Sequence, residues 1–194
     1  MPDSKIEFDE ATHVYRVGGV RYPSVTTVLS DMGMVDAEWF TEESRIRGTY
    51  VHKIVEWDEA GTLDEESIDP ALTGYAAAWR KFKDDTGYQT LATEKMLADH
   101  TYRFAGRLDN EGILYGKEIV LDIKSGAAGP ATALQLAAYE ILIGAPRKRY
   151  ALQLKPSGKY NLIHHSDRND CHVFLAALAC WWWQSNHNLK GNRK

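Results

Sequence analysis

The sequence predicts a mixed α/β domain in which a central mixed sheet is flanked by helices. Hydrophobic residues follow a brief strand pattern at the start, then helical spacing, then strand alternation, and finally helical spacing again. One strand–helix–strand order in the second half is typical of a crossover connection within a sheet. With 194 residues, 44% of them hydrophobic, the chain can bury one large core but has little room for a second. We therefore expect a single domain over residues 1–194.

Residues 1–35 predict a small β element and a short helix. Residues 6–8 and 13–17 alternate apolar and aromatic side chains, and a Gly-Gly turn leads into a returning strand at 20–22. Ser24 precedes apolar residues at helical spacing, so its hydroxyl can accept hydrogen bonds from the first free amides of a helix.

Residues 36–87 predict two longer helices. The first spans residues 36–60 and carries an apolar stripe around Val51 and Val55. The second spans residues 70–83 and places aromatic and aliphatic side chains at core-facing spacing. A glycine follows each helix, as is common at helix ends.

Residues 88–166 predict the sheet core, in which turn residues separate the strands and a glycine-rich turn precedes a helix at residues 131–143. The predicted strands span residues 90–97, 101–105, 107–114, 118–123, 149–154 and 160–164. Residues 167–194 close the fold with a helix to about residue 188 and a short basic tail.

The composition excludes several classes of protein. No run approaches the roughly 18 apolar residues of a membrane span and the N-terminus does not resemble a signal peptide, so we expect a soluble, cytoplasmic protein. Cys171 and Cys180 lie nine positions apart in one predicted helix and face opposite sides, which excludes a disulfide between them. The net charge of −4 gives no global basic surface, so a nucleic-acid partner would require local basic patches and metal ions.

Two aspartates on neighbouring predicted strands carry the main chemical signal. The carboxylates of Asp109 and Asp122 can meet at one end of a sheet, where they suit a hard divalent ion. His52 can add a nitrogen ligand, which favours Mn²⁺ or Mg²⁺. Lys124 shares a strand face with Asp122, so its ammonium can orient or help to deprotonate a water and stabilise charge on a phosphate. Taken singly, the same residues also fit ordinary roles in turns and at strand ends.

Four longer motifs occur in order with fitting gaps. They are Gly48-Thr49-Tyr50-Val51-His52, Gly106-Arg107-Leu108-Asp109, Leu121-Asp122-Ile123-Lys124-Ser125-Gly126 and Gln135-Leu136-Ala137-Ala138-Tyr139. Together they resemble the RecB-like branch of the PD-(D/E)XK nuclease superfamily. The segment Tyr22-Pro23-Ser24-Val25-Thr26-Thr27-Val28 is also similar to the opening of phage-encoded members. The resemblance implies a restriction-endonuclease-like core.

The resemblance also implies a role for each matched residue. The metal ligands would be His52, Asp109, Asp122 and the backbone carbonyl of Ile123. Lys124 would be the catalytic lysine, and the catalytic set would be completed by Asp109, Asp122, Gln135 and Tyr139. Gln135 and Tyr139 lie one helical turn apart, so they share a face that can reach the scissile phosphate or the DNA backbone. A satisfied polar pair on a half-buried helix is the alternative for these two.

Two further acids are candidates for the same site. Glu56 lies one turn after His52 and can orient the imidazole or hold a second ion, with a solvated helix charge as the alternative. Glu94 matches an acid that some members of the family place close to the metal.

Basic and hydroxyl side chains supply candidate DNA contacts, although most such charges are ordinary surface. These contacts are Ser24, Arg45, Arg47, Arg107, Gln135 and Tyr139. Three adjacent tryptophans, Trp181-Trp182-Trp183, sweep about 200° of a helix and cannot all face one core. At least one is expected in the core, and another can stack on bases or dock a partner chain.

The sequence thus leads us to expect a Mg²⁺- or Mn²⁺-dependent deoxyribonuclease. By resemblance, it would be an exonuclease of linear DNA in phage or bacterial recombination and repair, located in the bacterial cytoplasm. Its partners would be DNA, a single-strand annealing protein or helicase, and further copies of the chain in a homo-oligomer. Two cysteines cannot bind an iron–sulfur cluster of the four-cysteine type. The alternatives are an inactive nuclease-fold module that binds DNA or protein, an endonuclease, and an RNA-directed nuclease.

Overall fold

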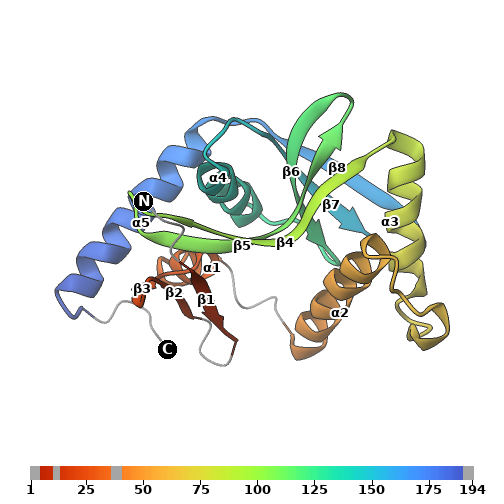
Figure 1. Ribbon diagram of the computed structural model, residues 1–194, viewed down its shortest axis with the longest axis horizontal. Helices are drawn as coiled ribbons and strands as arrows, with labels where there is room; N and C mark the ends of the chain where they lie inside the picture. The colour runs from red at the N-terminus through yellow and green to blue at the C-terminus, as the bar shows by residue number, and fades with distance from the viewer. Residues whose placement is uncertain (1–4, 11–13, 36–40, 190–194) are drawn as a thin grey trace.

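The computed structural model describes residues 5–10, 14–35 and 41–189, and within them it forms two sheets flanked by helices. The strands are β1 (Ile6–Asp9), β2 (Val14–Val17), β3 (Val20–Tyr22), β4 (Gln89–Asp99), β5 (Phe104–Leu114), β6 (Lys117–Lys124), β7 (Lys148–Leu154) and β8 (Tyr160–His165). The helices are α1 (Val25–Asp31), α2 (Glu42–Glu59), the 3₁₀ turn η2 (Glu65–Ser67), α3 (Thr73–Thr86), α4 (Ala131–Ile143) and α5 (Asn169–Asn186). In Figure 1, α5 and the small N-terminal sheet lie towards the left and α3 towards the right, with the larger sheet between them.

The small sheet is antiparallel in the order β1-β2-β3, and the predicted short helix follows it. Ser24 caps α1 as expected, because its Oγ accepts a hydrogen bond from the amide of Thr27 at 2.9 Å. The amide of Ala105 donates to the carbonyl of Pro23 at 3.0 Å. This bond attaches the N-terminal layer to the start of β5.

The two predicted longer helices are present with shifted starts. α2 begins at Glu42, after Thr41 caps it by accepting a bond from the amide of Ser44, and residues 36–40 lie outside the described residues. α3 begins at Thr73 instead of residue 70. The Asp69 carboxylate accepts a hydrogen bond from the amide of Ala71, which keeps these residues in a turn before the helix. α2 thus begins at a side-chain cap, whereas α3 begins after Leu72, which forms no side-chain cap.

The larger sheet has the order β4-β5-β6-β7-β8 and is mixed, as predicted. β6 and β7 are parallel and are joined through α4, whereas the other neighbouring pairs are antiparallel. This single crossover brings the end of β6 beside the start of α4. Within the described residues, no helix is long and apolar enough to cross a membrane.

The prediction of a separate strand at residues 101–105 was wrong. Residues 101–103 form the turn after β4, and β5 then runs without a break from Phe104 to Leu114. Gly106 lies inside this strand. A Cβ there would lie only 3.1–3.2 Å from side-chain atoms of Leu142, Val25 and Tyr139. The glycine allows close packing within the strand.

Two hydrophobic clusters provide most of the core. One packs α1, α4 and α5 around Leu108 and Val120. The other packs α2 and α3 around Leu121 and Ile123. Val120 and Leu121 are consecutive residues of β6 and point to opposite faces, as strand alternation requires. The sheet is thus covered on both faces, and the polar residues Asp109 and Asp122 are buried between the clusters.

Candidate metal centre

Three side chains from separate elements bring possible metal-binding atoms together. One ligand atom each from His52 on α2, Glu94 on β4 and Asp109 on β5 lie within 4.8 Å of one another. His52 Nδ1 is 3.6 Å from Asp109 Oδ2 and 3.8 Å from Glu94 Oε1. One imidazole nitrogen and two carboxylates form a donor set that suits a divalent ion such as Mg²⁺ or Mn²⁺.

The packing of α2 directs His52 towards the sheet. Val51 and Val55 are buried in the cluster with α3, so the predicted apolar stripe anchors the helix on both sides of the histidine. At Gly48, the helix approaches the loop after β6, and a Cβ there would lie 3.8 Å from Ser125 Oγ. The helix that carries His52 is therefore held against the ends of the central strands.

β5 changes the face that it presents at Asp109. Leu108 packs in the cluster with α1, α4 and α5. Asn110, two residues later, accepts a hydrogen bond from the hydroxyl of Tyr88, whose ring packs in the other cluster. Residues two apart in a regular strand share one face, so the alternation is interrupted between them. Asp109 lies at this interruption, between the two clusters.

The neighbouring strand carries a matching irregularity at Glu94. Thr93 pairs with Asn110 and Lys95 pairs with Leu108, which places Glu94 opposite Asp109. Glu94 has a left-handed backbone with φ of 47°, a conformation that non-glycine residues rarely adopt. Strained residues of this kind are concentrated at functional sites. The backbone geometry thus supports Glu94 as a member of the site.

Asp122 and Lys124 extend the site along β6. Asp122 is fully buried, and one of its oxygens lies 2.8 Å from Lys124 Nζ. Neither carboxylate oxygen accepts a well-aligned hydrogen bond from the described residues. A buried carboxylate without such bonds is unfavourable unless another ligand satisfies it. Apart from the ion pair with Lys124, the two oxygens have no partner among the described residues, which fits a residue that binds a metal ion.

A chain of hydrogen bonds connects Lys124 to α4. Lys124 Nζ donates to Gln135 Oε1 at 3.1 Å, and Gln135 Nε2 donates to the hydroxyl of Tyr139 at 2.9 Å. The amide of Ile123 donates to Asp109 Oδ2 at 2.7 Å, which fixes that carboxylate against β6. Four elements, α2, β5, β6 and α4, thus supply the predicted catalytic and metal-binding side chains at one place.

The electrostatics of the site favour a bound cation. Burial alone would lower the pKa of His52, but the charges of Asp109, Glu94 and Asp122 raise it from 6.5 to about 9. Burial raises the pKa of Asp122 from 3.8 to about 6 although Lys124 opposes the change, and burial also raises the pKa of Asp109. Without metal, the imidazole is protonated at neutral pH, so a metal ion that binds it must displace this proton.

The other predicted site residues lie around this centre. Glu56 is half-buried one turn after His52 but is not among the three clustered ligands. Arg45 is exposed and pairs with Glu42 at 2.6 Å, while Arg47 is half-buried and its Nε has no partner among the described residues. The roles of these three side chains remain predictions.

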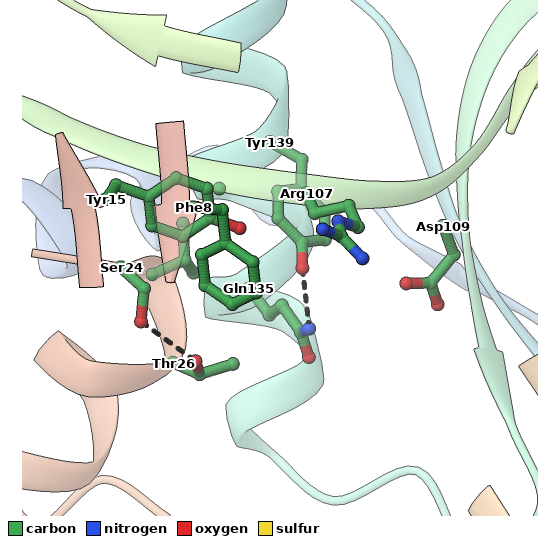
Figure 2. Close-up of a pocket in the computed structure, with 10 residues that line it drawn as sticks. Phe8, Tyr15, Ser24, Thr26, Arg107, Asp109, Gln135 and Tyr139 are labelled. Carbon is green, nitrogen blue, oxygen red and sulfur yellow. Dashed lines mark hydrogen bonds between the residues drawn. The ribbon is translucent and has the colours of Figure 1, made fainter. Parts of the chain in front are cut away.

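A pocket of about 220 Å³ lies beside the centre and contains the remaining predicted DNA contacts (Figure 2). Figure 2 shows Asp109 at one edge of the pocket and Arg107 near its middle. The Arg107 guanidinium lies 5.0 Å from the ring of Phe8 and 3.8 Å from a carboxylate oxygen of Glu94. The lining residues are Phe8, Tyr15, Ser24, Val25, Thr26, Gly106, Arg107, Asp109, Gln135 and Tyr139.

Sequence reasoning did not select Phe8, Tyr15 or Thr26 as site residues. Phe8 and Tyr15 belong to the small sheet, and only the folded chain brings that sheet to β5. Thr26 gave a usable signal, since it follows a capping serine at a helix start and lies in the motif similar to phage proteins.

Replacing Glu94 by glycine is expected to give a more stable metal-free protein than replacing it by alanine, and to weaken Mn²⁺ binding. Glycine relieves the left-handed backbone, which costs a side-chain-bearing residue about 1 kcal/mol. The substitution also removes one of three neighbouring carboxylates. The melting temperature in EDTA should exceed that of Glu94→Ala by roughly 2–4 °C, because alanine removes the charge but keeps the strain. Equal melting temperatures would exclude the strain, and unchanged Mn²⁺ affinity would remove Glu94 from the ligand set.

No protein family model matches the sequence, and no curated protein matches it. Among solved structures, the chain is similar to LHK-Exo, an alkaline exonuclease from Laribacter hongkongensis, at 14% identity and a TM-score of 0.40, covering 87% of this chain and 94% of that chain. The same exonuclease in complex with dAMP matches at 14% identity and a TM-score of 0.40, with 86% and 93% covered. A third structure, SSO0001, matches at 14% identity and a TM-score of 0.37, with 82% and 85% covered. The candidate site is therefore judged on its own geometry.

Proposed function

We propose that this chain is a divalent-metal-dependent deoxyribonuclease of the PD-(D/E)XK superfamily, in its RecB-like branch. The observation that carries the proposal is the fully buried carboxylate of Asp122, which accepts no well-aligned hydrogen bond from the described residues, pairs with Lys124 and interacts electrostatically with His52 and Asp109. The four sequence motifs that resemble the superfamily supply these same residues. A motif match and an independent geometric feature thus support one site.

The residues that would hold the metal are His52, Glu94, Asp109 and Asp122, with the Ile123 carbonyl as a further ligand. Two of these acids are buried and the third is half-buried, which gives a strongly negative site among oxygen donors. A divalent ion bound here would lower the pKa of a water molecule and neutralise charge on a phosphodiester. Mg²⁺ and Mn²⁺ fit this donor set better than a soft metal.

The chain's own side chains would position the reacting groups. Lys124 presents its ammonium beside Asp122, where it can orient a water and stabilise negative charge on the phosphate. Gln135 holds Lys124 through a hydrogen bond and is itself fixed by Tyr139. Arg107 and the hydroxyls of Ser24 and Thr26 line the adjacent pocket, where they suit contacts to the DNA backbone.

The cellular role follows from the sequence resemblance. We propose exonuclease action on linear DNA ends in phage or bacterial recombination and repair. The net charge of −4 gives no overall excess of basic charge to attract DNA. A single-strand annealing protein, a helicase or further copies of the chain would complete the DNA channel.

The test compares end-labelled linear duplex DNA with a covalently closed circle, each with Mn²⁺, Mg²⁺ or EDTA. Release of mononucleotides from the linear form alone, only with metal, is expected. Nicking of the circle would indicate an endonuclease. A labelled RNA is assayed in parallel, and degradation of the RNA alone would indicate an RNA-directed nuclease. Asp109→Asn is the inactive control. If neither DNA is cleaved with any metal although DNA binds, the protein is a binding module and the proposal is wrong.

A further inference from the structure

A second pocket lies between the small sheet and the C-terminal helix. It has a volume of about 100 Å³ and is lined by Arg21 of β3 and by Trp181, Trp182 and Ser185 of α5. Two indole rings, a guanidinium and a hydroxyl thus meet at one surface cavity. None of these residues belongs to the metal centre or to the first pocket.

The three adjacent tryptophans differ in exposure, as expected for consecutive positions on a helix. Trp181 is buried and donates from Nε1 to Asp31 at 2.8 Å, so it anchors α5 to α1. The Trp182 ring is nearly perpendicular to that of Trp181, with centroids 5.1 Å apart. Trp183 is 57% exposed and stacks on His187. Trp182 is therefore the half-buried ring at the boundary between core and surface.

The turn between β4 and β5 holds Trp182 in place. Its Nε1 donates to the carbonyl of Tyr102 at 3.2 Å, and the guanidinium of Arg103 lies 4.8 Å from its ring centroid. Arg103 has a left-handed backbone with φ of 57°, which is uncommon for a residue with a side chain. The arginine over the indole places a positive charge beside an aromatic ring. This combination suits a ligand that has both a flat ring and a negative charge.

We propose that this second pocket binds single-stranded DNA, with a base against Trp182 and the adjoining phosphate near Arg21 and Arg103. Nucleotide bases stack on indoles regardless of sequence, and arginines neutralise the backbone. In a duplex the bases are already stacked on one another, so a double strand cannot use the ring. Charge complementarity selects this ligand over an apolar peptide, because two arginines flank the indoles.

The proposed strand site goes beyond the nuclease activity and does not require it. The small sheet contributes to both pockets, with Phe8 and Tyr15 at the first and Arg21 at the second. Phe8 and Tyr15 share one face of this sheet, whereas Arg21 pairs with Arg16 on the other face. The strand site is therefore separate from the pocket beside the metal centre.

The test is binding of a labelled oligothymidylate, followed by fluorescence anisotropy in EDTA so that nothing is cleaved. Arg21→Ala and Trp182→Leu are each expected to weaken binding by about fivefold or more, as loss of a stacking or phosphate contact does. Arg16→Ala is the matched control, because Arg16 is exposed and pairs with Arg21 across β2 and β3 but does not line the pocket. It should change binding by less than twofold, and duplex binding should not depend on Trp182.

Equal losses in Arg16→Ala and Arg21→Ala would overturn the proposal, since general charge would then explain the binding. Unchanged binding in a folded Trp182→Leu would overturn it as well. Melting temperatures identify any variant that fails to fold, and the exposed Arg21 provides a variant that leaves the core intact. Mn²⁺-dependent hydrolysis of thymidine 5′-p-nitrophenyl phosphate, which is too short to span both pockets, should be unchanged in Arg21→Ala. Metal-dependent cleavage of linear DNA by the unaltered protein tests the nuclease proposal separately, and its absence would leave the strand site standing.

Discussion

Replacing Lys124 by methionine is expected to reduce DNA cleavage by about a hundredfold or more while Mn²⁺ still binds. The ammonium lies 2.8 Å from Asp122 and donates a hydrogen bond to Gln135, so under the proposed function it is the positioned acid–base group of the site. Loss of a positioned acid–base group costs about 10²–10⁴ in rate. Methionine keeps most of the unbranched side chain and removes the ammonium group. Single-turnover cleavage of linear DNA, together with Mn²⁺ titration, measures the two effects separately.

Lys117→Met is the matched control for this experiment. Lys117 begins the same strand, is exposed, and lies at the end of β6 opposite to Lys124. Its loss should leave the rate within a factor of about two, as expected for a surface charge far from the reacting groups. A fully active Lys124→Met would remove Lys124 from catalysis, whereas equal losses in both variants would indicate a general effect of charge.

Replacing Asp122 by asparagine is expected to abolish metal-dependent cleavage and yet stabilise the metal-free protein at pH 8. Burial raises the pKa of Asp122 in the folded state to about 6, above its ordinary value of 3.8. The folded state therefore binds more protons between these two values, and its stability falls as the pH rises from about 4 to 6. Above pH 6 the penalty is fully present, on the order of 3 kcal/mol. Asparagine carries no charge to bury.

Thermal unfolding in EDTA at pH 5 and pH 8 measures this difference. The gain of Asp122→Asn over the unaltered protein should be larger at pH 8 than at pH 5. Asp84→Asn, at an exposed position on α3, is the control and should change neither value. Mn²⁺ should raise the melting temperature of the unaltered protein, because binding to the folded state stabilises it, but not that of Asp122→Asn. A destabilised Asp122→Asn would mean that the carboxylate serves the fold and not a ligand.

The sequence predicted the parts of the fold that local chemistry determines. α4 spans residues 131–143 as predicted, because Pro130 and the left-handed Gly144 mark its ends in the sequence itself. The N-cap role of Ser24 was confirmed for the same reason. The extra strand at 101–105 was wrong because Gly106 had the appearance of a turn residue. Its actual role is to make space for Leu142 and Tyr139, which a single sequence does not reveal.

In the candidate site, too, some features could be predicted from local sequence and others depend on the fold. The spacing of Asp122 and Lys124 within one strand predicted that they share a face, and the two side chains pair at 2.8 Å. The placement of Glu94 could not be predicted, because it depends on a left-handed backbone and on pairing with β5. No alternation pattern contains that information. Arg45 pairs with Glu42 of its own helix, and its contact with DNA stays a prediction.

The interruption of β5 at Asp109 has a consequence for how the protein assembles. The four proposed ligands come from α2, β4, β5 and β6, and residues on either side of Asp109 pack in different clusters. Neither half of the chain can form the site alone, so ordering of the ligands should be among the last events of folding. Binding of a metal ion should then slow hydrogen exchange of the backbone amides in both clusters together, because opening of either cluster would disrupt the metal site.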